Sequence, residues 1–226
     1  MAEPSDGYTE TIQSVAAEQR RIRVESTYTP PSLETIVSIA RDDLPVSPLD
    51  LRTFLVEELA VVQAKIKSDD VDSWRGFYDQ AEVPHEEERC RDHLLLLLRQ
   101  GSTGITFTPE AHVAADKEVD IACSIGTLRL PIEIKGQWHR ELWRAADRQL
   151  AGLYAKDWRA DGHGIYLVLW FGNQVAEHKH LRGPGRSIDP PRTPEQLREM
   201  LVSTSLAALD GKIEVVVLDL SRPLTH

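Results

Sequence analysis

The sequence predicts an α/β protein with a mixed β-sheet, helices on both faces of the sheet, and an N-terminal helical arm. Helical and strand-like patterns follow one another in the order helix, helix, three strands, helix, strand, helix, strand. The runs 164–172 and 212–221 are almost wholly apolar, which is typical of strands covered on both faces. The turn-like stretch 124–127 predicts a hairpin between two of the first three strands.

Caps and breaking residues set the limits of these elements. Ser47 can cap the first helix, Gly101 follows the second, and Pro194 suits the first turn of the last. The predicted helices span 47–68, 84–102, 138–158 and 194–209. The predicted strands lie within 105–117, 119–136 (two strands), 164–172 and 212–221, and 183–194 is a predicted loop.

The chain is expected to have two parts. Residues 1–45 are polar and poor in core residues, with Pro30 and Pro31 breaking a short helical pattern, so they predict an arm or linker with short helices. Residues 46–226 are expected to form one domain. The arm is otherwise unexplained, and we expect it to join the domain to a second copy or to a larger assembly.

Composition narrows the class of protein. The net charge is −10, no apolar run is long enough to span a bilayer, and no signal pattern opens the chain, so we expect a soluble, cytoplasmic protein without a membrane partner. Cys90 and Cys123 are too few for a disulfide framework and are expected to be reduced and packed as small apolar groups. Residues 137–186 hold eight basic and five acidic side chains, and this one positive block favours a polyanion as partner.

Charged residues interrupt two apolar strands in the segment 119–136. Asp120 lies in the first strand, and Glu133 and Lys135 share one face of the second because strand side chains alternate. An isolated Glu-x-Lys pair is most simply a surface ion pair, but this run is otherwise apolar and the hairpin brings a second carboxylate close. Facing carboxylates repel, so a hard divalent cation is their natural occupant, with the Ile134 carbonyl as a further ligand. Lys135 can then hold a phosphate or orient a water.

This pattern, Asp120 followed by the triplet Glu133–Lys135 between two helices, resembles the PD-(D/E)xK nuclease superfamily. That superfamily includes restriction endonucleases, repair nucleases and nuclease modules of bacterial anti-phage defence proteins. The resemblance covers residues 84–172 by motif and extends to about 220 through a restriction-endonuclease-like αβββαβ order. Val119 stands where the motif has proline.

The resemblance implies an endonuclease that hydrolyses phosphodiester bonds of DNA and serves antiviral defence. Asp120, Glu133 and the carbonyl of Ile134 would bind Mg²⁺ or Mn²⁺, and Lys135 would position the water or the phosphate. The alternative is a catalytically silent module of the same fold that binds nucleic acid or a partner protein. The complete set of charges favours the enzyme, because a retired site need not keep all three.

The helix before the strands offers another acidic candidate. Glu87 shares one helical face with Cys90, Leu94 and Leu97, so it meets the core, where an unpaired carboxylate is costly. A role near the metal would explain it. An equally good explanation is that the acidic first turn only interacts with the helix dipole. Two other acids of this helix, Glu88 and Asp92, are fallback candidates.

The helix after Lys135 carries the remaining candidates. His139 and Gln149 interrupt an apolar stripe, and Gln149 resembles a glutamine that RecB-like nucleases carry beside the active site. Tyr154 is one residue too far along to match the tyrosine of those enzymes. His139 is either a phosphate contact or, slightly favoured, a residue that hydrogen-bonds a strand end at the start of the helix.

A basic ridge is the expected contact for nucleic acid. Arg140, Arg144 and Arg148 recur every four residues on a different face of the same helix, and Lys117 precedes the charged strands. Pairing with neighbouring acids on a solvated helix face is the alternative. The tryptophans 138, 143 and 158 are expected to pack rather than to stack on bases, and the segment 178–186 is expected to be a mobile basic loop near the substrate.

Overall fold

The computed structural model divides the chain into two compact units, Met1–Leu44 and Pro45–His226. It describes residues 15, 18–19, 44–68, 72–101, 104–113, 117–154, 159–185 and 189–222. The short helices expected in the N-terminal arm therefore lie outside the described residues, apart from three helical positions. The second unit holds the elements discussed below.

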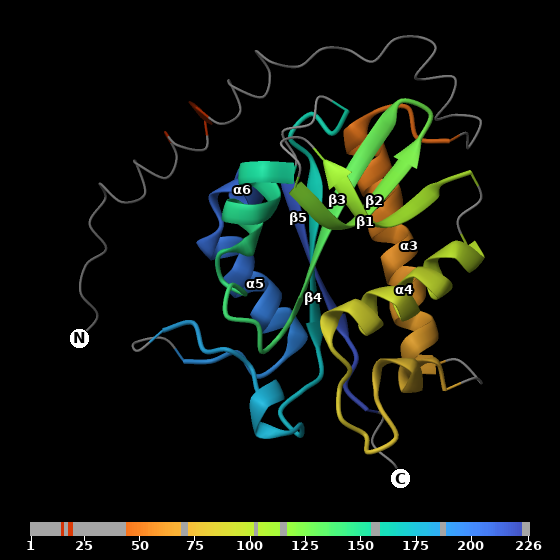
Figure 1. Cartoon of the computed structure of the whole chain (residues 1–226). Helices are drawn as coiled ribbons and strands as arrows, with labels where there is room; N and C mark the ends of the chain where they lie inside the picture. Colours follow the sequence, from red (N-terminus) through yellow and green to blue (C-terminus); the bar gives the residue numbers. More distant parts are fainter. Residues whose placement is uncertain are drawn as a thin grey trace. The chain divides into compact units, whose positions relative to one another are not determined.

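A five-stranded mixed sheet forms the centre of this unit (Figure 1). The strands are β1 (Thr106–Val113), β2 (Lys117–Ile125), β3 (Leu128–Gly136), β4 (Gly164–Trp170) and β5 (Ile213–Asp219). They lie in sequence order: β1, β2 and β3 are antiparallel neighbours, whereas β4 runs parallel to β3 and β5 parallel to β4. The predicted hairpin between β2 and β3 is confirmed, because Ile125 faces Leu128 across a two-residue turn in which Gly126 has a φ of 53°.

Helices cover both faces of the sheet, which confirms the predicted α/β class (Figure 1). The face towards α3 and α4 receives Ile132 and Ile134, and the opposite face packs against η2, α5 and α6. The α-helices are α3 (Pro48–Ser68), α4 (Glu87–Gly101), α5 (Pro194–Thr204) and α6 (Leu206–Leu209). Two 3₁₀ turns, η1 (Ser73–Phe77) and η3 (Glu177–Lys179), and a π-helix, η2 (Ala146–Tyr154), complete the described set.

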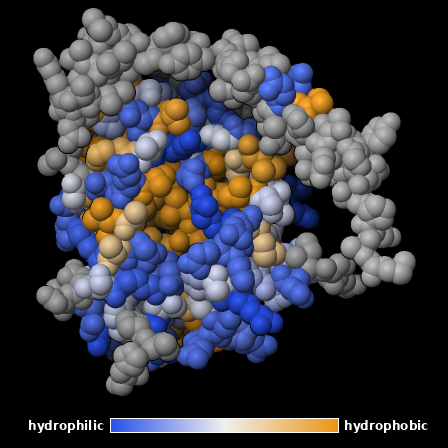
Figure 2. All heavy atoms as spheres, turned by 180° about the vertical axis from the view of Figure 1, so that it is seen from behind, coloured by the Kyte–Doolittle hydropathy of each residue, from blue (hydrophilic) through white to orange (hydrophobic). Residues whose placement is uncertain are grey.

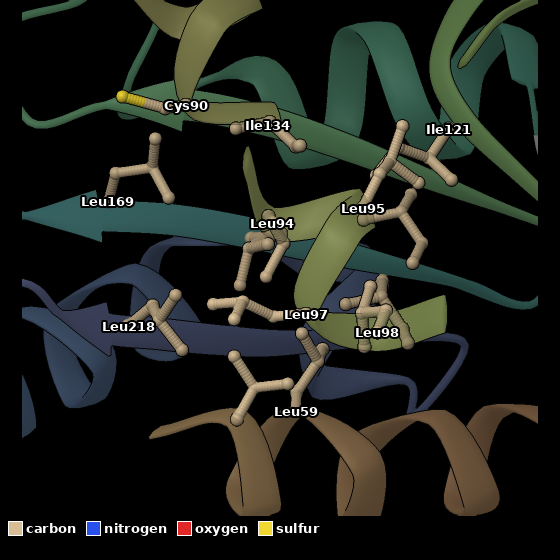
Figure 3. Packing of buried hydrophobic residues seen from close by; sticks show 14 of the residues in the cluster. Leu59, Cys90, Leu94, Leu95, Leu97, Leu98, Ile121, Ile134, Leu169 and Leu218 are labelled. Atoms are coloured by element: carbon tan, nitrogen blue, oxygen red, sulfur yellow. The ribbon is translucent and has the colours of Figure 1, made fainter. Parts of the chain in front are cut away.

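The larger of the two core clusters lies between the sheet and the helices α3 and α4 (Figure 3). Leu59 of α3 and Leu94 of α4 meet Leu169 and Leu218 of the central and edge strands. The cap expected at the start of α3 is present, since the Ser47 hydroxyl accepts a hydrogen bond from the backbone N–H of Asp50. Both cysteines are free and buried, as predicted.

Three element predictions need correction. The helix expected over 138–158 is a series of turns followed by the π-helix η2, and residues 155–158 lie outside the described residues. The helix expected over 194–209 breaks at Ser205, whose side chain caps α6 by accepting from Ala208 N–H. The second helix begins at Glu87, three residues after Pro84.

The strand β5 was expected to be fully buried, and instead forms an edge of the sheet. Val216 and Val217 are partly exposed. Side chains occupy the edge at both ends: Arg198 donates to the Val215 carbonyl, and the Gln63 amide bonds both the N–H and the C=O of Asp219. Such side-chain pairing blocks addition of a further strand.

The surface mixes polar and apolar areas. Seen from behind the view of Figure 1, apolar atoms gather in the middle of the described face and hydrophilic residues border them (Figure 2). Apolar atoms contribute more than half of the surface of ordinary folded proteins, so this area needs no partner to explain it. None of the described helices combines the length and the apolar content that crossing a membrane would require.

Candidate metal and phosphate site at the end of β3

The predicted charged residues meet where β2 and β3 part. The pairing of these strands begins at Ile121 opposite Ile132, so Asp120 and Glu133 lie one residue beyond the last pair. The Asp120 side chain takes over the role of a strand partner, because its Oδ2 accepts a hydrogen bond from the backbone N–H of Ile134 at 2.7 Å. The separation of the strands leaves both carboxylates on the sheet face that packs against η2.

Lys135 lies between the two carboxylates. Its Nζ is 2.6 Å from Glu133 Oε1 and 3.9 Å from Asp120 Oδ2. Glu133 is 3% exposed and Lys135 is 6% exposed, whereas the Asp120 side chain is 30% exposed. The cluster therefore has a buried floor formed by the ion pair and an accessible rim formed by Asp120.

Glu87 reaches the same strand end from α4. Its Oε1 accepts a hydrogen bond from the backbone N–H of Gly136 at 2.8 Å, and its side chain is half-buried. Of the two fallback acids, Glu88 is exposed, and Asp92 is exposed and paired with Arg91. Glu87 is thus the acid of this helix that faces the charged strands.

Burial and mutual repulsion shift the pKa values of these groups. Burial, and after it the negative charge of Asp120, raise the pKa of Glu133 to about 7. Burial also raises the pKa of Glu87. Burial alone would lower the pKa of Lys135, but the carboxylates around it outweigh burial and raise that pKa above its ordinary value. Lys135 is therefore held as a cation.

The donor set of the site fits a hard divalent cation. Glu87, Asp120 and Glu133 interact electrostatically with one another, and Lys135 supplies a single positive charge among them. If all three acids ionise, the cluster keeps two uncompensated negative charges and offers oxygen ligands, which Mg²⁺ and Mn²⁺ prefer. The described residues contain no cluster of three or more His, Cys, Asp or Glu side chains arranged around one metal position. The ligands to test are therefore Asp120, Glu133 and the carbonyl of Ile134.

Gln149 lies on the π-helix η2, which packs against β3 and β4. Its Oε1 is buried and has no hydrogen-bond partner among the described residues. A buried amide oxygen without a donor is costly, and in this position it is a free acceptor for a ligand. π-Helical turns are rare and occur often at functional sites, which agrees with a role for this segment.

His139 forms local hydrogen bonds. Its backbone N–H donates to the carbonyl of Gly136, and its Nδ1 accepts from the N–H of Glu141. The geometry corresponds to the local role that the sequence slightly favoured. Burial, assisted by the charges of Lys135 and Arg140, lowers the pKa of His139.

The predicted arginine ridge is exposed. Arg140, Arg144 and Arg148 are all solvent-accessible, and none forms a salt bridge with another described side chain. Arg140 lies in the turns before η2, so the three do not share one continuous helix. Lys117 opens β2 opposite Val113, and its side chain lies outside the described part of the structure.

Gln137 is a site neighbour that the sequence analysis missed. It is fully buried; its Nε2 donates to the carbonyls of Gly172 and Lys179, and its Oε1 accepts from the Phe171 N–H. Gln137 thus ties the end of β3 to the chain that follows β4. Its place in the alternation after Glu133 and Lys135 was an available signal.

Lys179 was also missed, because it lies in the segment expected to be a mobile basic loop. That expectation is wrong for Lys179, which is 1% exposed. Its Nζ lies 2.7 Å from Glu86 Oε1 and 3.8 Å from the centre of the Trp138 ring. Trp138 and Trp143 both pack, as expected, and Trp158 is outside the described residues.

Gly136 has to remain a glycine in this arrangement. A Cβ at this position would lie 2.6 Å from the nearest ring carbon of Trp138. Because Lys179 holds the other side of the ring, we expect Gly136→Ala to lower the free energy of unfolding by about 1–3 kcal/mol. Urea unfolding measures this, with Gly183→Ala as the matched control, since a Cβ there meets nothing within 4 Å. Equal stability of both variants would contradict the tight contact.

Comparison with known families gives one match. A family model described as a domain of unknown function, DUF8371, matches residues 51–173, more than half of the chain. The match runs from α3 to the residues just after β4 and includes the whole charged cluster. No curated protein and no solved structure gives a significant match.

Proposed function

The chain belongs to the DUF8371 family, and we propose that it is a Mg²⁺- or Mn²⁺-dependent nuclease of the PD-(D/E)xK type that hydrolyses phosphodiester bonds of DNA. The observation that carries the proposal is the convergence of Asp120, Glu133 and Lys135 at the point where β2 and β3 part. A cluster with excess negative charge and one fixed cation suits a metal-bound phosphate better than it suits a structural ion pair.

Each residue has a role that follows from its geometry. Asp120, Glu133 and the Ile134 carbonyl would hold the cation, which when bound supplies Lewis-acid activation of water and neutralises charge on the phosphate. Lys135 acts as a hydrogen-bond donor to a phosphate oxygen or to the attacking water, because its raised pKa keeps it protonated. Glu87 positions the strand end through Gly136 N–H.

A nucleic-acid-binding module without turnover is the second candidate. The 2.6 Å contact between Lys135 and Glu133 favours it, because in this arrangement the lysine already occupies one carboxylate. For cleavage, a cation and a phosphate must compete successfully with that ion pair. Metal-dependent turnover therefore separates the two candidates.

The first test is incubation with supercoiled plasmid and with linear DNA in Mg²⁺ or Mn²⁺, with EDTA as control. We expect nicking or degradation that EDTA abolishes and that Asp120→Asn reduces by at least about 100-fold. The matched control is Glu214→Gln, which removes an acid that pairs with Arg198 on the edge strand β5. Absence of cleavage by the unaltered protein in either metal, or equal cleavage by Asp120→Asn, would contradict the nuclease.

A further inference from the structure

A groove lies beside the charged cluster, along residues 177–185 (light blue in Figure 1). Its volume is about 560 Å³, which is within the range of cavities that hold small molecules. Its charged and aromatic lining consists of Trp138, Glu177, His178, His180 and Arg182, together with two glycines. We call this hollow the 177–185 groove.

The groove is joined rigidly to the strand that carries the candidate site. The Arg182 N–H donates to the backbone carbonyl of Gln137, two residues after Lys135. The Arg182 carbonyl accepts from Trp143 Nε1 at 2.8 Å. The backbone of Arg182 is therefore held between the end of β3 and the segment that carries the exposed arginines.

The cations that line the groove are not neutralised by any described acid. Arg182 and His178 are exposed, and within the described part of the chain neither side chain forms an ion pair. Lys179 contributes no free charge, since Glu86 pairs with it and the Trp138 ring covers it. Glu177 is the one acid among the described residues of the lining, so a polyanion would meet an excess of positive charge.

Trp138 gives the groove an apolar wall. The Lys179 ammonium lies over its ring, and Gly136 packs closely against its six-membered ring. The remaining surface of Trp138 suits contact with the edge of a base or with a sugar, rather than full stacking. An apolar wall beside free cations is the combination by which proteins hold single-stranded nucleic acid.

We propose that the 177–185 groove binds one nucleotide of a single nucleic-acid strand whose neighbouring phosphodiester lies at the charged cluster. The inference rests on the proposed nuclease and adds the form of its substrate. Arg182 and His178 contact the phosphate, and Trp138 contacts the base or sugar. A hollow of about 560 Å³ accommodates a nucleotide of a single strand, whereas a duplex is too wide to enter it.

The test measures binding without cleavage. Fluorescence anisotropy of a short labelled single-stranded DNA is recorded with the whole protein in EDTA, over a range of salt concentrations, with the matching duplex and inorganic phosphate as competitors. We expect the double variant Arg182→Gln, His178→Gln to bind about tenfold more weakly and to lose about one unit of salt slope per phosphate contact. Arg75→Gln is the control, because that exposed arginine pairs with Asp72 at the start of η1.

The outcomes separate this inference from the proposed function. Unchanged affinity in the double variant, or duplex that competes better than single strand, overturns the groove assignment even if the protein cleaves DNA. Competition by inorganic phosphate at the same concentration as the oligonucleotide also overturns it, because a simple anion site would then suffice. Loss of affinity in the double variant supports the groove, even if the unaltered protein proves unable to cleave.

Discussion

Replacing Lys135 by methionine is expected to slow metal-dependent DNA cleavage by about 10²–10³-fold, while the fold stays intact. Among the described residues, the Nζ of Lys135 is the cation that lies within reach of both carboxylates at the strand end. Loss of one positioned donor to a phosphate in a buried site typically has an effect of this size. Methionine keeps the length of the buried stem, so packing on the η2 face of the sheet changes little.

The fold should survive because Glu133 can become neutral. Without Lys135, burial and Asp120 push the pKa of Glu133 further up, and the protonated acid no longer needs a counter-ion. Single-turnover cleavage and thermal unfolding of the same preparation measure both effects. Lys67→Met is the control, since that lysine pairs with Asp219 far from the cluster along the chain. A cleavage rate equal to that of the control would remove Lys135 from the mechanism.

The strands and their charges were predictable because they depend on local patterns. Side chains alternate along any strand, so Glu133 and Lys135 had to share a face whatever the rest of the chain did. The turn at Gly126 then fixed which residue of the preceding strand lies opposite, and Asp120 followed. The same reasoning gave the buried strand β4 and the apolar face of α3.

Contacts between distant segments explain the errors. The residues after Gly136 have good helical periodicity, but His139 forms local turns and Trp143 donates to Arg182, 39 residues away. These tertiary hydrogen bonds outweigh a weak helical preference. Likewise, the bond between Lys179 and Glu86 spans 93 residues, and nothing in the local pattern of a basic loop shows that one of its lysines is buried.

Glu87 illustrates a partial success. Its helical face predicted that it meets the core, yet an N-terminal acid has an equally good explanation in the helix dipole. The choice depended on how α4 lies against the end of β3, which the sequence does not encode in one segment. The hydrogen bond from Gly136 N–H places Glu87 at that strand end.

The substitution Glu133→Gln is expected to change stability and metal binding in opposite directions. A carboxyl whose pKa rises from 4.5 to about 7 on folding stabilises the protein fully below pH 4.5 and loses that contribution as the pH rises through 7. At about 1.4 kcal/mol per pH unit, the loss is at most about 3 kcal/mol. The pKa of Lys135 lies above this window, so its contribution stays constant across it. In EDTA, the Glu133→Gln variant should lack the decline in unfolding free energy between pH 4.5 and 7.

Metal should reverse the ranking. A cation requires Glu133 in its ionised form, so Mg²⁺ should stabilise the unaltered protein more above pH 7 than below it and should not stabilise Glu133→Gln. Urea unfolding at a series of pH values, with EDTA or Mg²⁺, measures both effects, and Glu214→Gln is the exposed control. If Glu133→Gln keeps the pH-dependent decline, the buried carboxyl is not its source. If it keeps the stabilisation by Mg²⁺, Glu133 is not a ligand, and the site would bind the cation through Asp120 and other oxygens alone.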